Sequence, residues 1–387
     1  MKSMVDWLPW NSIRFHFTWT LLLFASLLLI LLHQNKDRFV VSQRFNPSRA
    51  SIILPPERAC RFSANRSSLP WCSVRRFRDH IRAYRAFPEC GKWRDDLLNY
   101  DIDFCDWKDF NLRLCVSSKG IKRIVVLGDS AGTRLYLALL RLIEGKRGTC
   151  TMDEYEYPRR STTPNTTYFM NRLGWSDAQD FYTSRRQCAT CRAQVHSCRF
   201  GHRRLVVEFL ESYLFREKSL MVLLNEASPE NKTGARSMQE FLFKVYFPKV
   251  GQPDLLLFLL PMHHEKLRIP DATKRDLNWF MDLVKKYKAR KTALYLIPSA
   301  GEFMGKTSPM VWTPSKTFLP MDYLYARHAM LFPLLEPFLL DPDLKINGFI
   351  NAVNMSKTRK DWSEDGIHFT NVWYDRLAQI LASLFCA

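Results

Sequence analysis

The sequence predicts an α/β protein with a doubly wound, mostly parallel sheet between two layers of helices. From residue 120 onwards, short apolar segments alternate with longer segments whose apolar residues have helical spacing. The segment 254–260 is apolar on both faces, which is typical of a buried parallel strand. The chain has 387 residues, 47% of them hydrophobic, which is enough for a large core. Its 14 glycines and 20 prolines exclude collagen-like and low-complexity classes, so a globular three-layer sandwich is expected.

The expected elements follow one another in a regular order. Residues 123–128 form a β-branched run that ends at a glycine, and residues 133–143 carry apolar side chains at helical spacing. A strand, a turn and a helix are therefore expected here. The short apolar segments 205–209 and 254–260 are the next expected strands. The alternation then continues with a helix over 271–288, a strand over 292–297, a helix over 321–336, a strand over 347–351 and a helix over 371–385.

Residues 15–32 predict a membrane anchor. They would rise about 27 Å as a helix, close to the thickness of a bilayer core, and His16 is their only ionisable residue. A cleaved signal peptide is the alternative, but no small-residue cleavage site follows the segment. Basic residues lie on both sides and do not settle the orientation. The expected organisation is a short cytoplasmic tail at 1–14, an anchor at 15–32, a stem at 33–59, a cysteine-rich segment at 60–117 and the main domain at 118–387.

The cysteines and glycosylation sequons indicate a luminal or extracellular body. All ten cysteines follow the predicted anchor, and an even, dispersed set suits disulfides in an oxidising compartment. Five of them lie in residues 60–117, so at least one pairs outside that segment or stays free. Cys386 either ties down the C-terminal tail or links two chains. We expect a single-pass type II membrane protein of the secretory pathway, in the Golgi or endoplasmic reticulum lumen, or at the cell surface. The sequons begin at Asn65, Asn165, Asn231 and Asn354.

The net charge of +19 favours anionic partners. The basic clusters are scattered between apolar elements, and no zinc-finger array, RNP-like strand or basic zipper accompanies them. We therefore expect no nucleic-acid partner. Most clusters are expected to be solvated faces, with an electropositive groove for an acidic glycan or a membrane surface as the alternative.

A second alternative concerns Cys188, Cys191 and Cys198, which together with His196 and His202 have a spacing that suits zinc. In an oxidising compartment, disulfides are the favoured interpretation of these cysteines. No metal site is therefore expected.

The residues that carry chemistry are expected at one edge of the sheet. Ser130, in Gly128-Asp129-Ser130, follows the first predicted strand and begins the next helix, and active sites of doubly wound sheets lie at the carboxyl ends of strands. There its backbone N–H faces a developing oxyanion, but its hydroxyl needs a neighbouring base. His368 and Asp365, after the last predicted strand, would supply that base and the carboxylate that orients it. Each motif alone is common at turns and surfaces, but their joint placement predicts a catalytic triad.

Two motifs resemble those of a known superfamily. Val-Leu-Gly-Asp-Ser-Ala-Gly-Thr-Arg-Leu-Tyr at 126–136 and Asp-Gly-Ile-His at 365–368 are similar to the first and last blocks of SGNH (GDSL-type) hydrolases. Within that superfamily, residues 120–387 most resemble the PC-esterase and trichome birefringence-like branch, whose members are often membrane-anchored in the secretory pathway. The resemblance implies an SGNH-like domain over 118–387, with Ser130 as nucleophile, His368 as base and Asp365 as its orienting acid. It also implies ester hydrolysis or O-acyl transfer through an acyl-serine, commonly on acylated carbohydrates, without a cofactor.

The middle blocks of the superfamily are poorly matched. They supply a glycine N–H and an asparagine side chain to the oxyanion hole, beside the N–H of the serine. Gly174 is the candidate for the glycine, and His263 and His264 stand where the asparagine is expected. Each histidine is interpreted either as a donor or substrate ligand or as a polar strand cap. Arg134, four residues after the serine, either binds a substrate anion or faces solvent on its helix.

The leading functional hypothesis is a membrane-anchored luminal serine esterase that removes O-acyl groups, chiefly O-acetyl, from glycans or glycoconjugates. An O-acyltransferase is the alternative, because an acyl-serine can be resolved by a sugar hydroxyl instead of water. A single span offers no evident membrane channel for acyl-CoA, which favours hydrolysis. A third hypothesis is a non-catalytic glycan- or protein-binding module. The intact triad argues against it, whereas the poor middle blocks argue for it.

Overall fold

The computed structural model describes residues of one compact unit, Pro56–Ala387. The predicted tail, anchor and stem (1–14, 15–32 and 33–59) lie outside the described residues. Within the described part of the chain, no helix is both long and apolar enough to cross a membrane. The described residues are 62, 68–85, 90–94, 99–108, 110–145, 150–156, 166–175, 193–212, 216, 221, 224–225, 231, 233–260, 270–298, 300, 332–347, 350, 352–357, 359–364 and 368–387.

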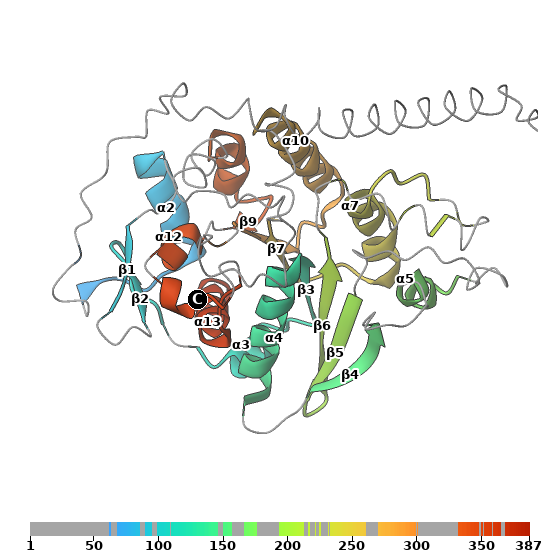
Figure 1. Ribbon diagram of the computed structural model, residues 1–387, viewed down its shortest axis with the longest axis horizontal. Coiled ribbons are helices and arrows are strands. Elements are labelled where there is room, and N and C mark those ends of the chain that lie inside the picture. The colour runs from blue at the N-terminus through green and yellow to red at the C-terminus, as the bar shows by residue number, and fades with distance from the viewer. Residues whose placement is uncertain are drawn as a thin grey trace, which may run out of the picture. The chain divides into compact units, whose positions relative to one another are not determined.

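A seven-stranded sheet organises this unit (Figure 1). From one edge to the other, its strands are β4 (Cys150–Glu156), β5 (Ala193–Phe200), β6 (Arg203–Glu211), β3 (Arg123–Gly128), β7 (Leu255–Leu259), β8 (Ala293–Ile297) and β9 (Ile346–Asn347). The central strand β3 pairs in parallel with β6 and β7, and the β7–β8 and β8–β9 pairs are parallel as well. β5 pairs antiparallel with both β4 and β6. The predicted mostly parallel sheet is confirmed.

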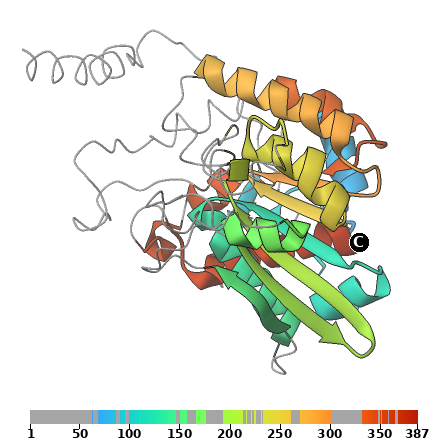
Figure 2. The same cartoon turned by 90° about the vertical axis from the view of Figure 1, so that its right-hand side faces the viewer.

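Helices cover both faces of the sheet (Figures 1 and 2). One face carries α3 (Leu112–Ser118), α4 (Ser130–Glu144) and α13 (Asn371–Cys386). The other carries α5 (Thr166–Leu173), α7 (Met238–Phe241), a π-helical turn (Leu242–Tyr246), α8 (Phe247–Val250), α10 (Pro270–Tyr287) and the helical residues 332–340. Alternate side chains of β3 enter two separate cores, Ile124 and Val126 beneath α4 and α13, Val125 and Leu127 on the opposite face. The expected α/β arrangement, with helices on both faces of the sheet, is thus present.

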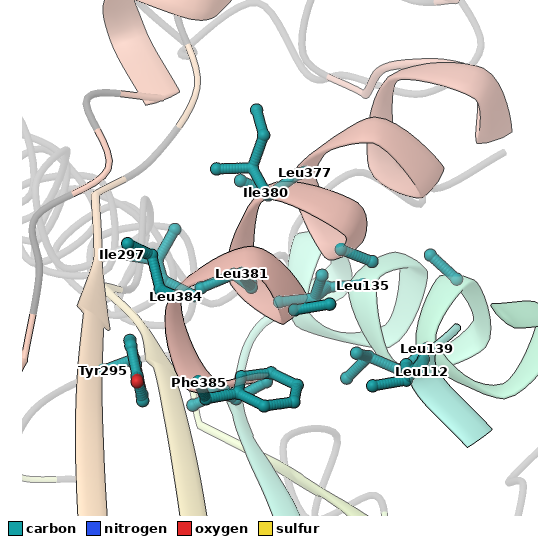
Figure 3. Close-up of a cluster of buried hydrophobic side chains, with 14 of the residues drawn as sticks. Leu112, Leu135, Leu139, Tyr295, Ile297, Leu377, Ile380, Leu381, Leu384 and Phe385 are labelled. Carbon is teal, nitrogen blue, oxygen red and sulfur yellow. The ribbon is translucent and has the colours of Figure 1, made fainter. Parts of the chain in front are cut away.

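The last helix, α13, is buried along most of its length (Figure 3). Its apolar side chains pack between the sheet and α4, so the segment just before it is held at a fixed place above the strand ends. The residues in this packing include Leu112, Leu135, Leu139, Tyr295, Ile297, Leu377, Ile380, Leu381, Leu384 and Phe385.

One disulfide among the described residues ties the cysteine-rich segment to the C-terminal helix of the main domain. This segment contains α2 (Val74–Tyr84), β1 (Gly91–Trp93) and β2 (Tyr100–Ile102), and its Cys72 bonds Cys105. Cys115 bonds Cys386, which confirms that a cysteine of this segment pairs outside it and shows that Cys386 ties down the tail. Among the described residues no cysteine is free. Two further disulfide-bonded sites are the Cys150–Cys198 pair and Cys90.

Most expected elements are found within a few residues of their predicted bounds, but several observed elements were not predicted. The antiparallel strands β4 and β5 were not predicted, because β4 is charged and β5 alternates polar and apolar residues without a strong apolar run. The strand expected at 347–351 is shorter, since β9 ends at Asn347 and α12 (Ala352–Lys357) begins soon after. Of the helix expected at 321–336, residues 321–331 lie outside the described residues, and residues 332–340 are helical.

Candidate active site

Ser130 is the first residue of α4 and follows β3 almost directly. Between them, Asp129 caps the helix, because its side chain accepts a hydrogen bond of 3.1 Å from the N–H of Ala131. Asp129 is only 1% exposed. In the Gly-Asp-Ser motif the aspartate therefore fixes the first helical turn, and the serine stands at the carboxyl edge of the sheet, as predicted.

Two glycines allow this helix start to lie against the strands. A Cβ atom at Gly128 would come within 3.1 Å of the Cβ of Leu259 and 3.4 Å of the Cα of Gly132. A Cβ at Gly132 would come within 3.1 Å of Cε2 of Phe209. Larger residues at these positions would push α4 away from β6 and β7, so the glycines set the height of Ser130 above the sheet.

His368 lies beside the serine. Its Nε2 is 2.7 Å from the Oγ of Ser130, although 238 residues separate the two in the sequence. With the imidazole neutral and its proton on Nδ1, the serine hydroxyl donates to Nε2, the arrangement that prepares a serine for attack. The structure thus brings together two of the three predicted triad residues. The third, Asp365, lies outside the described residues.

Backbone contacts join the described residues around His368, 363–364 and 368–370, which together are called the histidine loop. Ser363 and Phe369 form an antiparallel β-bridge at its base. Inside the loop, the N–H of Glu364 donates to the carbonyl of His368 over 2.7 Å. On the other side, the N–H of Thr370 donates to the carbonyl of Trp362 over 2.8 Å. These bonds fix the backbone on both sides of the histidine, and α13 begins immediately after them.

Arg134 reaches this loop from α4. Its Nη1 donates to the carbonyl of Phe369 over 2.9 Å, and its Nη2 pairs with the carboxylate of Glu364 over 2.7 Å. From the sequence, Arg134 was expected to be an anion ligand or a solvent-facing residue, and neither interpretation predicted this contact. The guanidinium joins the helix of the nucleophile to the loop of the base.

An apolar pocket opens beside the histidine. It is small, about 20 Å³, little more than one water molecule occupies. Its walls come from the start of α4, the ends of β7 and β8, and α13. The described lining residues are Ala131, Leu259, Leu260, Ile297, Pro298, Ala300, His368, Trp373, Tyr374 and Leu377.

Of the three predicted oxyanion-hole donors, Ser130, Gly174 and His263, the structure describes the first two. The N–H of Ser130 belongs to the first turn of α4, whose donors have no acceptor within the helix and carry the positive end of its dipole. Gly174 ends α5 with a left-handed φ of +63°, on the layer opposite α4. Its oxyanion role stays a prediction. His263 and His264 lie outside the described residues.

The remaining predicted sites are distributed over the molecule. Asn65 and Asn165 lie outside the described residues, and Asn231 is half-buried. Asn354 lies in α12, where its side chain donates to the hydroxyl of Tyr100 over 3.0 Å. Cys198 is in a disulfide with Cys150, as favoured over zinc, whereas Cys188 and Cys191 lie outside the described residues. Among the described residues, no cluster of metal-ligating side chains is present.

A buried polar cluster on the face opposite α4 was not predicted. Glu208, fully buried in β6, pairs with Arg123 and accepts hydrogen bonds from the hydroxyls of Tyr168 and Tyr246. Burial and the charge of Glu208 raise the pKa of both tyrosines, so both remain protonated donors. The signal in the sequence was a single glutamate within an otherwise apolar run. This cluster joins β3, β6, α5 and the π-helical turn, and it supports the sheet from the side away from Ser130.

The described geometry is suited to acyl-transfer chemistry. A serine hydroxyl, a histidine within hydrogen-bond distance and a helix N-terminus converge at the carboxyl edge of a parallel sheet. Comparison of the sequence with models of known protein families and with curated proteins finds no match.

Proposed function

We propose that the protein is a membrane-anchored luminal serine esterase of the SGNH type that removes short O-acyl groups, chiefly O-acetyl, from glycans or glycoconjugates. The observation that carries the proposal is the 2.7 Å contact between the Oγ of Ser130 and Nε2 of His368. A Gly-Asp-Ser motif at a helix start commonly serves only to cap the helix. Capping alone does not require a histidine from 238 residues further along the chain beside the serine.

In the first half of the reaction, the Oγ of Ser130 attacks the ester carbonyl and His368 takes the serine proton. The carbonyl oxygen becomes negatively charged, and the N–H of Ser130 at the positive end of α4 stabilises it. The imidazolium then protonates the sugar oxygen as the ester bond breaks. The deacylated sugar leaves, and the acyl group remains on Ser130.

In the second half, His368 takes a proton from water, whose oxygen attacks the acyl-serine. The tetrahedral intermediate collapses, the proton returns to Oγ, and a carboxylic acid is released. Asp365, through its place in the Asp-x-x-His motif, is proposed to orient the imidazole and stabilise its charged form. No cofactor takes part in any step.

The pocket beside His368 supports a short acyl group. Its walls are apolar and its free volume of about 20 Å³ suits a methyl group better than a longer chain. Because Ala131 is next to the nucleophile and lines the pocket, an acyl carbon on Ser130 would place its substituent there. Acetyl is therefore the proposed acyl group.

The disulfides support a luminal location. The described residues include three intrachain bonds, and bonds of this kind persist in oxidising compartments. The same proposal includes a membrane anchor at residues 15–32. It places the site of action in the Golgi, in the endoplasmic reticulum or at the cell surface.

The test is hydrolysis of 4-nitrophenyl acetate and of an acetylated polysaccharide by the full chain, produced in a secretory host and purified in detergent. We expect turnover with the native chain and at least a thousandfold less with Ser130→Ala at an unchanged melting temperature. Release of 4-nitrophenol that requires an added sugar acceptor, with the acetyl group recovered on that sugar, would identify a transferase instead. A folded native chain that turns over neither substrate would favour the binding-module hypothesis.

A further inference from the structure

We infer that Arg134 is a positioning residue, which sets the distance between Ser130 and His368 by holding the histidine loop onto the helix of the nucleophile. This inference rests on the proposed function, because it assigns a role in that reaction. The arginine does not touch the reacting atoms. It acts through the backbone next to His368.

The position of Arg134 on α4 suits this role. It lies four residues after Ser130, so the two side chains occupy the same face of the helix, about one turn apart. The helix is a rigid element with continuous backbone hydrogen bonds. A group fastened to Arg134 is therefore held at a fixed offset from the serine.

The contacts of Arg134 lie on both sides of the histidine. One nitrogen of the guanidinium donates to the carbonyl of Phe369, the residue after His368, and another pairs with Glu364, four residues before it. Glu364 itself donates its N–H to the carbonyl of His368. A single planar guanidinium thus holds described residues on both sides of the histidine, a geometry that the one ammonium of a lysine cannot reproduce.

Phe369 anchors the histidine loop to α13 through its side chain. Its side chain is fully buried and its ring lies 4.9 Å from that of Trp373 in α13. The apolar packing holds the loop from the side of α13, and Arg134 holds it from α4. Without the arginine, only one of these two anchors remains, and the imidazole can shift relative to the hydroxyl. A displacement of about 1 Å at a reacting group costs up to about a hundredfold in rate.

The chain contains a matched control. Arg141, two turns further along α4, pairs with Asp375 of α13 over 2.6 Å. The side chains are 38% and 34% exposed, close to the 28% and 45% of Arg134 and Glu364. Both arginines connect α4 to the C-terminal part of the chain. Of the two, Arg134 contacts the residues beside His368, whereas Arg141 contacts α13.

The experiment compares Arg134→Gln, Arg134→Lys and Arg141→Gln in the full chain, with 4-nitrophenyl acetate as substrate. We expect at least a tenfold lower kcat for Arg134→Gln with KM within twofold, a smaller loss for Arg134→Lys, and a kcat within twofold of native for Arg141→Gln. The melting temperatures of the two glutamine variants should fall by similar, small amounts. An unchanged kcat in Arg134→Gln would overturn the inference, and so would a raised KM at constant kcat, which would make Arg134 a substrate ligand.

Amide hydrogen exchange provides a readout that does not depend on activity. In Arg134→Gln, the N–H groups of Glu364 and Thr370, which close the loop, should exchange at least tenfold faster than in the native chain. In Arg141→Gln they should exchange at the native rate. If the native chain shows no Ser130-dependent turnover, the proposed function fails, whereas unchanged exchange in Arg134→Gln refutes the positioning role by itself.

Discussion

The Oγ of Ser130 and Nε2 of His368 lie 2.7 Å apart, although the two residues belong to opposite ends of the sheet-forming sequence. The serine follows the central strand β3, and the histidine precedes α13, which packs against α4. Parallel strands make this possible, because their carboxyl ends meet at one edge and bring distant loops together. The contact depends on how closely α4 lies on the strands and on how firmly α13 is fixed.

Gly128→Ala should weaken both the fold and the site. The new Cβ would lie 3.1 Å from the Cβ of Leu259, so α4 or β7 must shift. We expect a loss of about 1–3 kcal/mol in the free energy of unfolding, measured in urea, and at least a tenfold lower kcat. Gly120→Ala is the control. Gly120 has a φ of +66° and no neighbour within 4 Å of a Cβ, so it should lose stability through backbone strain but keep its kcat. Equal kcat losses in both variants would contradict the role of Gly128.

Removing the Cys115–Cys386 disulfide should destabilise the protein strongly. The bond joins α3 to the end of α13 across 271 residues, and α13 fixes the position of His368. We expect the Cys115→Ser, Cys386→Ser double variant to lose about 2–4 kcal/mol in the free energy of unfolding. Removing the Cys150–Cys198 bond, which joins the edge strand β4 to its neighbour β5, should leave kcat unchanged once the variant is folded. A double variant at 115 and 386 with native stability would refute this account of α13.

The acyl pocket predicts a preference for short esters. The native chain should hydrolyse 4-nitrophenyl acetate with a kcat/KM at least tenfold above that for the hexanoate, because the described walls leave room for little more than a water-sized group. Leu377→Ala should reduce this ratio, since Leu377 lines the pocket, whereas Leu381→Ala on the same helix should not (Figure 3). Both variants should lose about 2–5 kcal/mol of stability. A native preference for the hexanoate would contradict the assignment of acetyl.

Lys288 should make the free energy of unfolding depend on pH in the alkaline range. Burial, together with the positive charge of Lys345, lowers the pKa of its ammonium from 10.5 to about 8. Between these two values the unfolded chain binds more protons than the folded protein, so folding becomes more favourable as the pH rises. Relative to Lys288→Met, the native protein should therefore gain stability between pH 7 and pH 10. Urea unfolding of both proteins measures the difference, and a difference that stays constant with pH would refute the prediction.

Local patterns predicted the central elements of the fold well. The β-branched run of β3, the apolar run of β7 and the helical spacing of α4 and α13 are strong local sequence patterns. They arise because these elements are buried on one or both faces. β4 and β5 lacked such a signal. They lie at the edge of the sheet, and their pairing depends on partners distant in sequence and on the Cys150–Cys198 bond.

The candidate site was predictable only in part, for a related reason. Ser130 and His368 were predicted from their residue types and from the order of their two motifs in the sequence. The structure brings the two side chains together. Arg134 has no such signal, because a helical arginine usually faces solvent, and only its contacts with Glu364 and Phe369 distinguish it. The buried Glu208 could be suspected from its apolar neighbours, but its tyrosine partners come from two other elements.

The most direct test of the central claim is covalent labelling of Ser130 by a fluorophosphonate, followed by mass spectrometry of the labelled peptide. Only a serine activated by a neighbouring base reacts readily with such a probe. We predict that the native full chain carries a single adduct on Ser130, formed at least a hundredfold more slowly in His368→Ala and absent in Ser130→Ala. A folded native chain without an adduct on Ser130, or with one that forms equally fast in His368→Ala, would contradict the account.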